Sequence, residues 1–326
     1  MKKIICLLLC LLIFTGCEEK ENVDITYDDT YYKIATPYKN AVGSYSISSF
    51  DKNEVESMLM NLSSNFFKTN NSLYQQGQYL DSDEIKNLIN QFNETEPIEI
   101  DKIEIKPKFI LSIYEQNYLT VNNNLKGISL ALIVSNKQYY NDNKSYKIID
   151  EEVVLEYAKE KADELVKYMH EQKNLKDTRI VVGIYLESNN TLKGSFKYIG
   201  ELNKNKLDLK HVNYNYQSLD SNYIMTNDFD TYNNILAIKQ SLNNYTTLYL
   251  NPIGLYKNKD LVRLDLNFTK SYFSNIDILT ISDIIKNYLN SFDSSVQINV
   301  YFKSNNKIKA HMIRKDNKLE TYILED

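Results

Sequence analysis

One cysteine stands where its thiol could react. Cys17 follows Thr15 and Gly16 at the end of an apolar stretch, and charged residues begin directly after it. Small side chains before a cysteine fit a signal peptidase, and the thiol is the nucleophile that takes up a diacylglyceryl group. The arrangement resembles a bacterial lipobox and predicts lipid attachment at Cys17, although Phe14 stands where leucine is usual.

The segment before Cys17 has the layout of a secretory signal. Two lysines form a basic start, and the apolar run Ile4–Phe14 is shorter than the about 20 residues that a transmembrane helix needs. We therefore expect residues 1–16 to be a lipoprotein signal peptide and the acidic residues 17–31 to be a tether. Acyl chains would then bind membrane lipid and hold the protein at the extracytoplasmic face of the cell membrane. An ordinary signal peptide, or a short membrane-dipping helix, with a chance cysteine is the alternative.

The rest of the chain carries few residues for catalysis or metal binding. The cysteines are Cys6, Cys10 and Cys17, and the histidines are His170, His211 and His311. No thiol follows residue 17, and the isolated histidines favour structural roles. No zinc-protease, nucleophile-elbow, P-loop or dinucleotide motif occurs. We expect no metal, no cofactor and no enzyme activity. A cell-wall hydrolase that takes two carboxylates from distant segments is the alternative.

The composition is that of a folded protein without a nucleic-acid surface. The 326 residues are 43% hydrophobic and 25% charged, and the net charge is -5. The chain has no basic block of the kind that binds nucleic acid, so we expect no nucleic-acid partner. The 27 tyrosines accompany many Asn, Lys and Ile residues, a bias of A/T-rich codons, and are weak support for an aromatic binding surface.

Hydrophobic periodicity predicts N-terminal helices and then one pattern that appears twice. Apolar residues three and four apart predict helices over 51–66 and 82–92, and Pro107 is expected to open a third helix through Tyr114. A strand, a helix and two strands are then predicted at 126–140, 150–171, 179–190 and 194–202, and again at 259–273, 280–290, 296–306 and 307–315.

The repeated order predicts an α/β (α+β) fold. We expect two related β-α-β-β modules with mixed sheets and helices packed on one face, preceded by the N-terminal helices. The first module is placed at residues 32–205 and the second at 206–326, with the Asn-rich stretch 201–227 as the linker. Coincidence of common elements in an Asn-rich chain is the alternative to an internal duplication.

Several stretches of the body resemble the CamS-type sex pheromone lipoproteins of Firmicutes. The resemblance rests on "LYQQGQYLD" (73–81), "SIYEQNYL" (112–119), "LKGISLALIVSNKQYY" (125–140) and "LKDTRIVVGIY" (175–185). It implies that the end of the signal peptide is trimmed and released as a heptapeptide pheromone. The matching segment here is Cys10, Leu11, Leu12, Ile13, Phe14, Thr15 and Gly16. The resemblance implies no reaction for the mature body.

The mature body is therefore expected to be a binding or surface-interaction domain. One alternative is a module that binds an envelope polymer or a peptide, and its candidate surface is the segment with Tyr74, Gly77 and Tyr79. Gly77 would permit a tight turn between the two tyrosines. The other interpretation of this segment is that both tyrosines simply pack between two helices.

Overall fold

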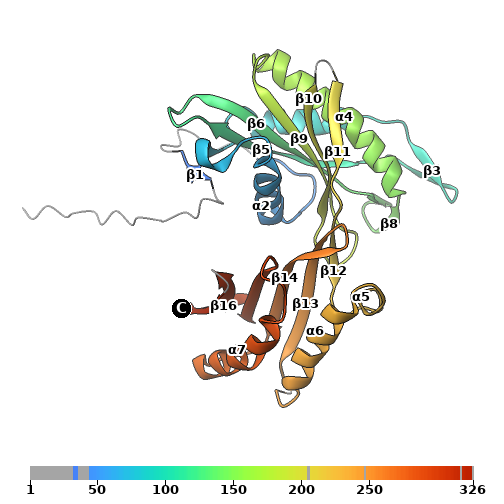
Figure 1. Cartoon of the computed structure of the whole chain (residues 1–326). Coiled ribbons are helices and arrows are strands. Elements are labelled where there is room, and N and C mark those ends of the chain that lie inside the picture. The colour runs from blue at the N-terminus through green and yellow to red at the C-terminus, as the bar shows by residue number, and fades with distance from the viewer. Residues whose placement is uncertain (1–31, 36–43, 204–205, 246, 316–317, 325–326) are drawn as a thin grey trace, which may run out of the picture.

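The chain builds two α/β modules, each on its own sheet (Figure 1). The computed structural model describes residues 32–35, 44–203, 206–245, 247–315 and 318–324. The first module has a seven-stranded sheet in the order β1-β2-β5-β6-β9-β10-β11. These strands are β1 (Lys33–Ile34), β2 (Leu73–Gln76), β5 (Ile110–Leu119), β6 (Leu125–Val134), β9 (Arg179–Leu186), β10 (Ser195–Asn203) and β11 (Lys206–His211).

The second module has a six-stranded sheet in the order β12-β13-β14-β15-β16-β17. Its strands are β12 (Tyr214–Ser218), β13 (Tyr249–Lys257), β14 (Asp260–Thr269), β15 (Gln297–Ser304), β16 (Lys307–Lys315) and β17 (Lys318–Ile323). Strand β12 begins three residues after β11 ends, so the chain passes directly from one sheet to the other.

Each sheet contains a parallel strand pair joined by a helix. β6 pairs with β9 through α4 (Glu151–Gln172), and β14 pairs with β15 through α7 (Asn275–Leu289). Parallel neighbours need such a crossover, whereas antiparallel neighbours need only a short turn. The strands that follow, β10 and β11 in one sheet and β16 and β17 in the other, add on antiparallel. The two predicted β-α-β-β patterns are confirmed, and their origin by duplication stays a prediction.

Side-chain caps define where the helices begin. Asp150, at the start of α4, accepts a hydrogen bond from the backbone N–H of Glu152 at 2.8 Å. α3 (Ser82–Phe92) begins with a reciprocal capping box between Asp81 and Glu84. The remaining helices are α2 (Lys52–Ser63), α5 (Asn222–Asn227), α6 (Phe229–Ser241) and the short 3-10 turn at Thr69–Asn71.

The first sheet is buried on both faces. Along β6, Leu130 and Leu132 pack with residues of α3 and α4, whereas Ala131 and Ile133 pack with residues of α2 on the opposite face. In the second module, α6 and α7 cover one face of the sheet. The other face of that sheet turns toward α2, which lies between the two modules (Figure 1).

Two expectations about local structure are wrong. Residues from Pro107 to Tyr114 do not form a helix, because β5 begins at Ile110 and is buried on both faces. A strand buried on both faces loses its alternation, so its apolar run resembles a buried helix. The stretch 201–227 is not a plain linker, since it contains β11, β12 and α5. β11 pairs with β10, so the first sheet continues past residue 205.

A pair of short hairpins extends the first module. They are formed by β3 (Ile98–Ile100) with β4 (Ile103–Ile105), and by β7 (Lys137–Tyr140) with β8 (Ser145–Ile148). The stretch 126–140, expected as a single strand, divides into β6 and β7 at Ser135 and Asn136.

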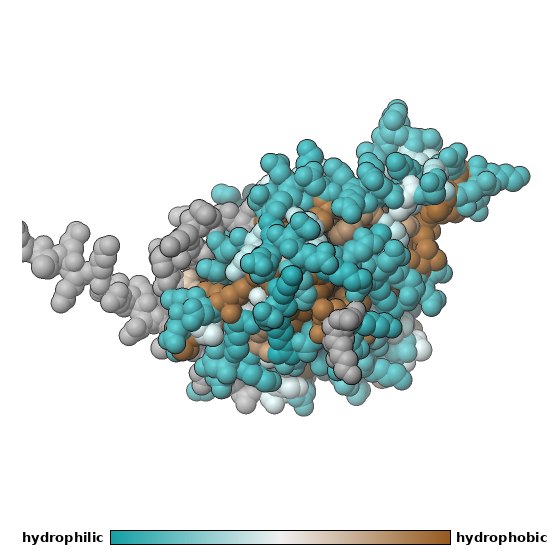
Figure 2. Space-filling view, turned by 90° about the horizontal axis from the view of Figure 1, so that it is seen from above, coloured by the Kyte–Doolittle hydropathy of each residue, from teal (hydrophilic) through white to brown (hydrophobic). Residues whose placement is uncertain are grey.

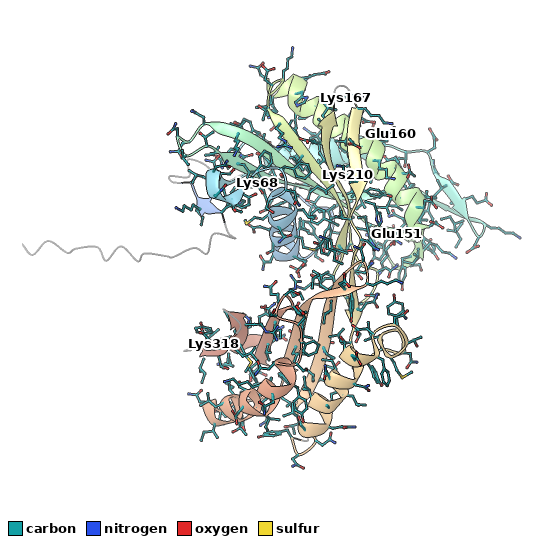
Figure 3. The ribbon with its side chains drawn as sticks, in the orientation of Figure 1. Lys68, Glu151, Glu160, Lys167, Lys210 and Lys318 are labelled. Carbon is teal, nitrogen blue, oxygen red and sulfur yellow. The ribbon has the colours of Figure 1, made fainter. Side chains whose placement is uncertain are left out.

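The outer surface is largely hydrophilic in the view from above (Figure 2). Along α4, Lys159 pairs with Glu156 and Lys167 pairs with Asp163, each at 2.6 Å. Lys167 lies at the end of α4 that is remote from the second module, and Glu151 lies at the near end (Figure 3). The outer surface of α4 is therefore a solvated, charged face.

Candidate binding cleft between the modules

A cleft of about 970 Å³ lies between α2 and the uncovered face of the second sheet. α2 forms one wall, and residues of β14 and β15 form the floor opposite it. Clefts between domains, within about 300–1,000 Å³, are where proteins most often bind small ligands. The volume and the position make this cleft the leading candidate site.

Strand alternation supplies the polar floor. On β14, Leu264 and Leu266 point into the core of the second module, so Arg263 and Asp265 point into the cleft. On β15, Ile298, Val300 and Phe302 enter the same core, as the alternation in the sequence predicts. The intervening residues Asn299, Tyr301 and Lys303 line the cleft.

A buried ionic cluster joins α2 to the second module. Glu54 of α2 is only 4% exposed, and both of its carboxylate oxygens accept hydrogen bonds from Arg263 Nη2 at 3.0 Å. Lys193 Nζ donates to Glu54 Oε2 at 2.8 Å, and the Tyr216 hydroxyl donates to Glu54 Oε1. Three residues from distant parts of the chain thus bind the carboxylate of Glu54. These contacts hold the modules together at this end of the cleft.

The charge state of Glu54 follows from competing effects. Burial alone would raise the pKa of this carboxyl, because a charge loses hydration in the interior. The nearby charges of Arg263 and Lys193, with the hydrogen bonds from Lys193 and Tyr216, outweigh burial and hold the pKa below its usual range. Burial also raises the pKa of the Tyr216 hydroxyl, which therefore stays protonated and remains a donor.

The floor beyond this cluster is a network of amides and charges. Asp265 accepts a hydrogen bond from Asn299 Nδ2 at 2.8 Å and lies 3.2 Å from Arg263 Nε. Lys303 Nζ donates to Asn267 Oδ1 at 2.7 Å. Burial lowers the pKa of Lys303, and the positive charge of Lys193 lowers it further, so the two lysines face the same space.

An aromatic stack crosses the floor from β15 to β16. The rings of Tyr301 and His311 lie parallel, with centroids 4.6 Å apart and planes 2° from each other. His311 Nε2 is buried and makes no hydrogen bond within the described part of the chain. Burial lowers the pKa of His311, which favours the neutral ring. His170, in contrast, lies in the last turn of α4, and its Nε2 atom is 3.2 Å from the backbone carbonyl oxygen of Thr178.

A smaller hollow of about 180 Å³ adjoins the cleft and shares Lys193 with it. Glu187 lines this hollow, and its Oε2 atom is buried without a hydrogen bond among the described residues. Burial, with repulsion from Asp51, raises the pKa of Glu187 to about 7.

The structure does not bring Tyr74 and Tyr79 together. Tyr74 packs with α2, and its hydroxyl donates to Glu56 Oε1 at 2.8 Å, whereas Tyr79 packs with α3 and α4 on the other side of the sheet. Gly77 adopts no positive φ, and a Cβ there would lie 2.6 Å from Cβ of Glu115. These placements support the packing interpretation, and a binding role for the three residues stays an untested prediction.

Glu115 explains why this segment needs its glycine. Its buried carboxylate accepts hydrogen bonds from the backbone N–H groups of Gln78, Tyr79 and Leu80, at 2.7, 3.1 and 2.8 Å. The side chain therefore holds the segment between β2 and α3, and its stem occupies the space beside Gly77. Burial raises the pKa of Glu115 although the three N–H groups act in the opposite direction.

The sequence does not indicate the residues that line the cleft. Glu54, Lys193 and Arg263 are single charged residues in unrelated segments, and no motif connects them. The available signal was the second face of β14 and β15, where polar residues alternate with the predicted core. Cys17, the segment Cys10–Gly16 and the tether to residue 31 lie outside the described residues.

The profile of the family described as "CamS sex pheromone cAM373 precursor" matches residues 39–320. The chain belongs to this family. The resemblance found in the sequence is thereby confirmed, and CamS is a sex pheromone precursor family. A search among curated proteins finds no match.

Two solved structures of CamS-type proteins share the fold. The sex pheromone precursor of Lactobacillus salivarius subsp. salivarius UCC118 superposes with a TM-score of 0.71 at 17% identity, over 84% of this chain and 87% of the other. The C-terminal domain of the sex pheromone staph-cAM373 precursor of Staphylococcus aureus gives 0.70 at 22% identity, over 86% and 98%. The α/β fold with mixed sheets is therefore that of the CamS proteins.

The described residues add two negative findings. Within them no helix combines the length and the apolar character that crossing a membrane requires. The same ranges hold no group of three or more His, Cys, Asp or Glu side chains placed to bind a metal ion.

Proposed function

We propose that this CamS protein is a lipoprotein held at the extracytoplasmic face of the cell membrane through acylated Cys17. The basic start, the short apolar run and the small residues before Cys17 support this proposal. Each buried CH2 group contributes about 0.8 kcal/mol, so two or three acyl chains anchor a protein stably. Membership of a pheromone precursor family agrees with a surface location.

The signal-peptide segment from Cys10 to Gly16 is the source of a heptapeptide pheromone in this proposal. The segment is uncharged and largely apolar, as a peptide read by an oligopeptide receptor needs to be. Its sequence differs at most positions from the family's best-known pheromone. We therefore expect that the receptor for that pheromone does not recognise it.

The mature body has a non-enzymatic binding role, and the cleft between the modules is its site. The observation that carries this conclusion is the polar cleft of about 970 Å³ built from both modules. Glu54 and Asp265, two carboxylates of the cleft, are both engaged by Arg263. Neither is a free acid or base, which favours binding of an envelope polymer or a peptide over a cell-wall hydrolase.

The anchoring proposal is tested by mass spectrometry and membrane fractionation of the native protein. We expect the mature chain to begin at Cys17, to carry the mass of its acyl groups and to sediment with membranes. The variant Cys17→Ser should accumulate unprocessed or be shed into the medium. A Cys17→Ser product of normal mature size in the membrane fraction would contradict the proposal.

The same culture supernatant tests the pheromone segment. We expect a peptide ending at Gly16 in the medium of cells that express the wild-type chain, and none from cells that express Cys17→Ser. Absence of the peptide in both cultures, with normal acylation of the wild type, would contradict release without affecting the anchor.

A further inference from the structure

The cleft between the modules presents side-chain chemistry suited to one class of ligand. We propose that it binds an uncharged oligosaccharide strand across the face of β14 and β15. This inference rests on the proposed binding role of the cleft and names the ligand.

The buried charges of the cleft are compensated within the protein. Four carboxylates and three cations line it, and the buried ones are paired with each other. Arg263 and Lys193 neutralise Glu54, and Asp265 is engaged by Arg263 and Asn299. Binding of a polyanion needs an excess of unpaired cations, and binding of a polycation needs unpaired carboxylates. The balance therefore favours an uncharged ligand.

The remaining polar groups of the cleft are amides and hydroxyls on both walls. On α2, Asn53, Ser57 and Asn61 follow each other at intervals of four residues and share one side of the helix. On the sheet, Gln297 and Asn299 lie opposite. An amide both donates and accepts hydrogen bonds, and so does a sugar hydroxyl. Two facing rows of such groups suit a polyol strand that lies between them.

Tyr301 supplies the apolar contact that a sugar ring needs. Its position is set by the parallel stack on His311, so the ring is held in place before any ligand arrives. Lys303 Nζ lies 5.3 Å from the centre of the Tyr301 ring and is held there by its hydrogen bond to Asn267, so a donor borders the ring. An ordered aromatic ring bordered by donors resembles the lining of pockets that bind small polar ligands.

The direction of approach disfavours a peptide. An extended peptide binds to a sheet by adding a strand at an edge, where main-chain groups are free. β14 and β15 are inner strands, and their edges are already paired with β13, with each other and with β16. The cleft thus offers side chains and no free backbone edge, which fits a ligand recognised through hydroxyl groups.

The test is calorimetric titration of the mature protein in detergent with two uncharged hexasaccharides, chitohexaose and cellohexaose. We expect one of them to bind, and Tyr301→Ala to weaken that binding about tenfold or more. The matched control is Tyr272→Ala, because Tyr272 is 69% exposed in the same module and does not line the cleft. Thermal unfolding of each variant separates loss of binding from loss of folding, and Tyr301→Phe should retain binding.

Three results would contradict the proposal that the cleft binds an uncharged oligosaccharide. The first is that neither hexasaccharide binds at millimolar concentration, and the second is that Tyr301→Ala and Tyr272→Ala weaken binding equally. The third is that the protein binds hexagalacturonic acid or an extended peptide more tightly than either hexasaccharide. Purified cell-wall sacculi provide the second arm. Retention on sacculi without oligosaccharide binding would leave the proposed binding role intact, and failure to bind sacculi, hexasaccharides and peptides alike would remove both.

Discussion

At the scale of single residues, the modules are joined by one carboxylate. Glu54 is buried, and its charge is stabilised only because Arg263, Lys193 and Tyr216 all reach it. Removing one partner of a buried ion pair strongly lowers the free energy of unfolding, because an unpaired charge is left in the interior. This loss usually exceeds the stability that the intact pair adds relative to apolar residues in its place. Arg263 also contacts Asp265, so it serves both the cluster and the cleft floor.

We predict that Arg263→Met lowers the free energy of unfolding by about 3 kcal/mol. The physical reason is the uncompensated carboxylate of Glu54, together with the loss of the contact to Asp265. Urea unfolding followed by circular dichroism measures the change.

A second arginine of the chain provides the matched control. Arg179 pairs with Glu201 at the surface of the first module, and its side chain is 43% exposed. Exposed pairs contribute about 0–1 kcal/mol, so Arg179→Met should cost clearly less. Equal effects of the two substitutions would show that the Glu54 cluster does not hold the modules together.

At the scale of elements, one close contact positions the segment between β2 and α3. The side chain of Glu115 on β5 lies beside this segment, and its carboxylate accepts hydrogen bonds from three consecutive backbone N–H groups. The carboxylate can do so because Gly77 leaves room for its stem. Gly77, which was predicted to permit a tight turn, thus serves the packing of a neighbouring strand.

We predict that Gly77→Ala destabilises the protein by about 1–3 kcal/mol, since the new methyl group would overlap the Glu115 side chain. Chemical denaturation measures the loss. The double variant Gly77→Ala with Glu115→Gly should be more stable than the sum of the two single effects implies, because Glu115→Gly also removes the Cβ atom that the new methyl group would overlap. Strict additivity would contradict the role given to Gly77.

At the scale of the whole molecule, the two modules share part of their core. Tyr216, Ile253 and Leu255 of the second module belong to the same buried cluster as α2 and the first sheet. The shared cluster and the ionic cluster lie side by side at the junction, so the cleft walls are coupled through both. We therefore expect the two modules to unfold together rather than as independent domains.

We predict a single cooperative transition for the wild-type chain, observed alike by far-ultraviolet circular dichroism and by tyrosine fluorescence. Leu255→Asp places an unpaired charge in the shared cluster and should separate the transition into two. Two resolved transitions in the wild type, or a Leu255→Asp chain that still unfolds in one step at unchanged midpoint, would contradict this coupling.

The two modules could be predicted from the sequence because their signals are local. Caps such as Asp150, the helical stripe of α4 and the alternation along β15 each reside within one segment, and together they predict the repeated β-α-β-β order. Several stretches of the sequence, taken in order, also indicated the CamS family. β5 was predicted wrongly, because burial on both faces removes the periodicity that distinguishes a strand from a helix.

The candidate binding cleft, in contrast, could not be predicted from the sequence, because it forms only when the chain is folded. Glu54, Lys193, Tyr216 and Arg263 lie far apart in the chain. They meet because α2 packs on the face of the first sheet opposite α3 and α4 and also faces the second sheet. Polar residues on β14 and β15 look in the sequence like an ordinary solvated face. They become the floor of a cleft only when another module lies opposite, and such a long-range contact leaves no local pattern to read.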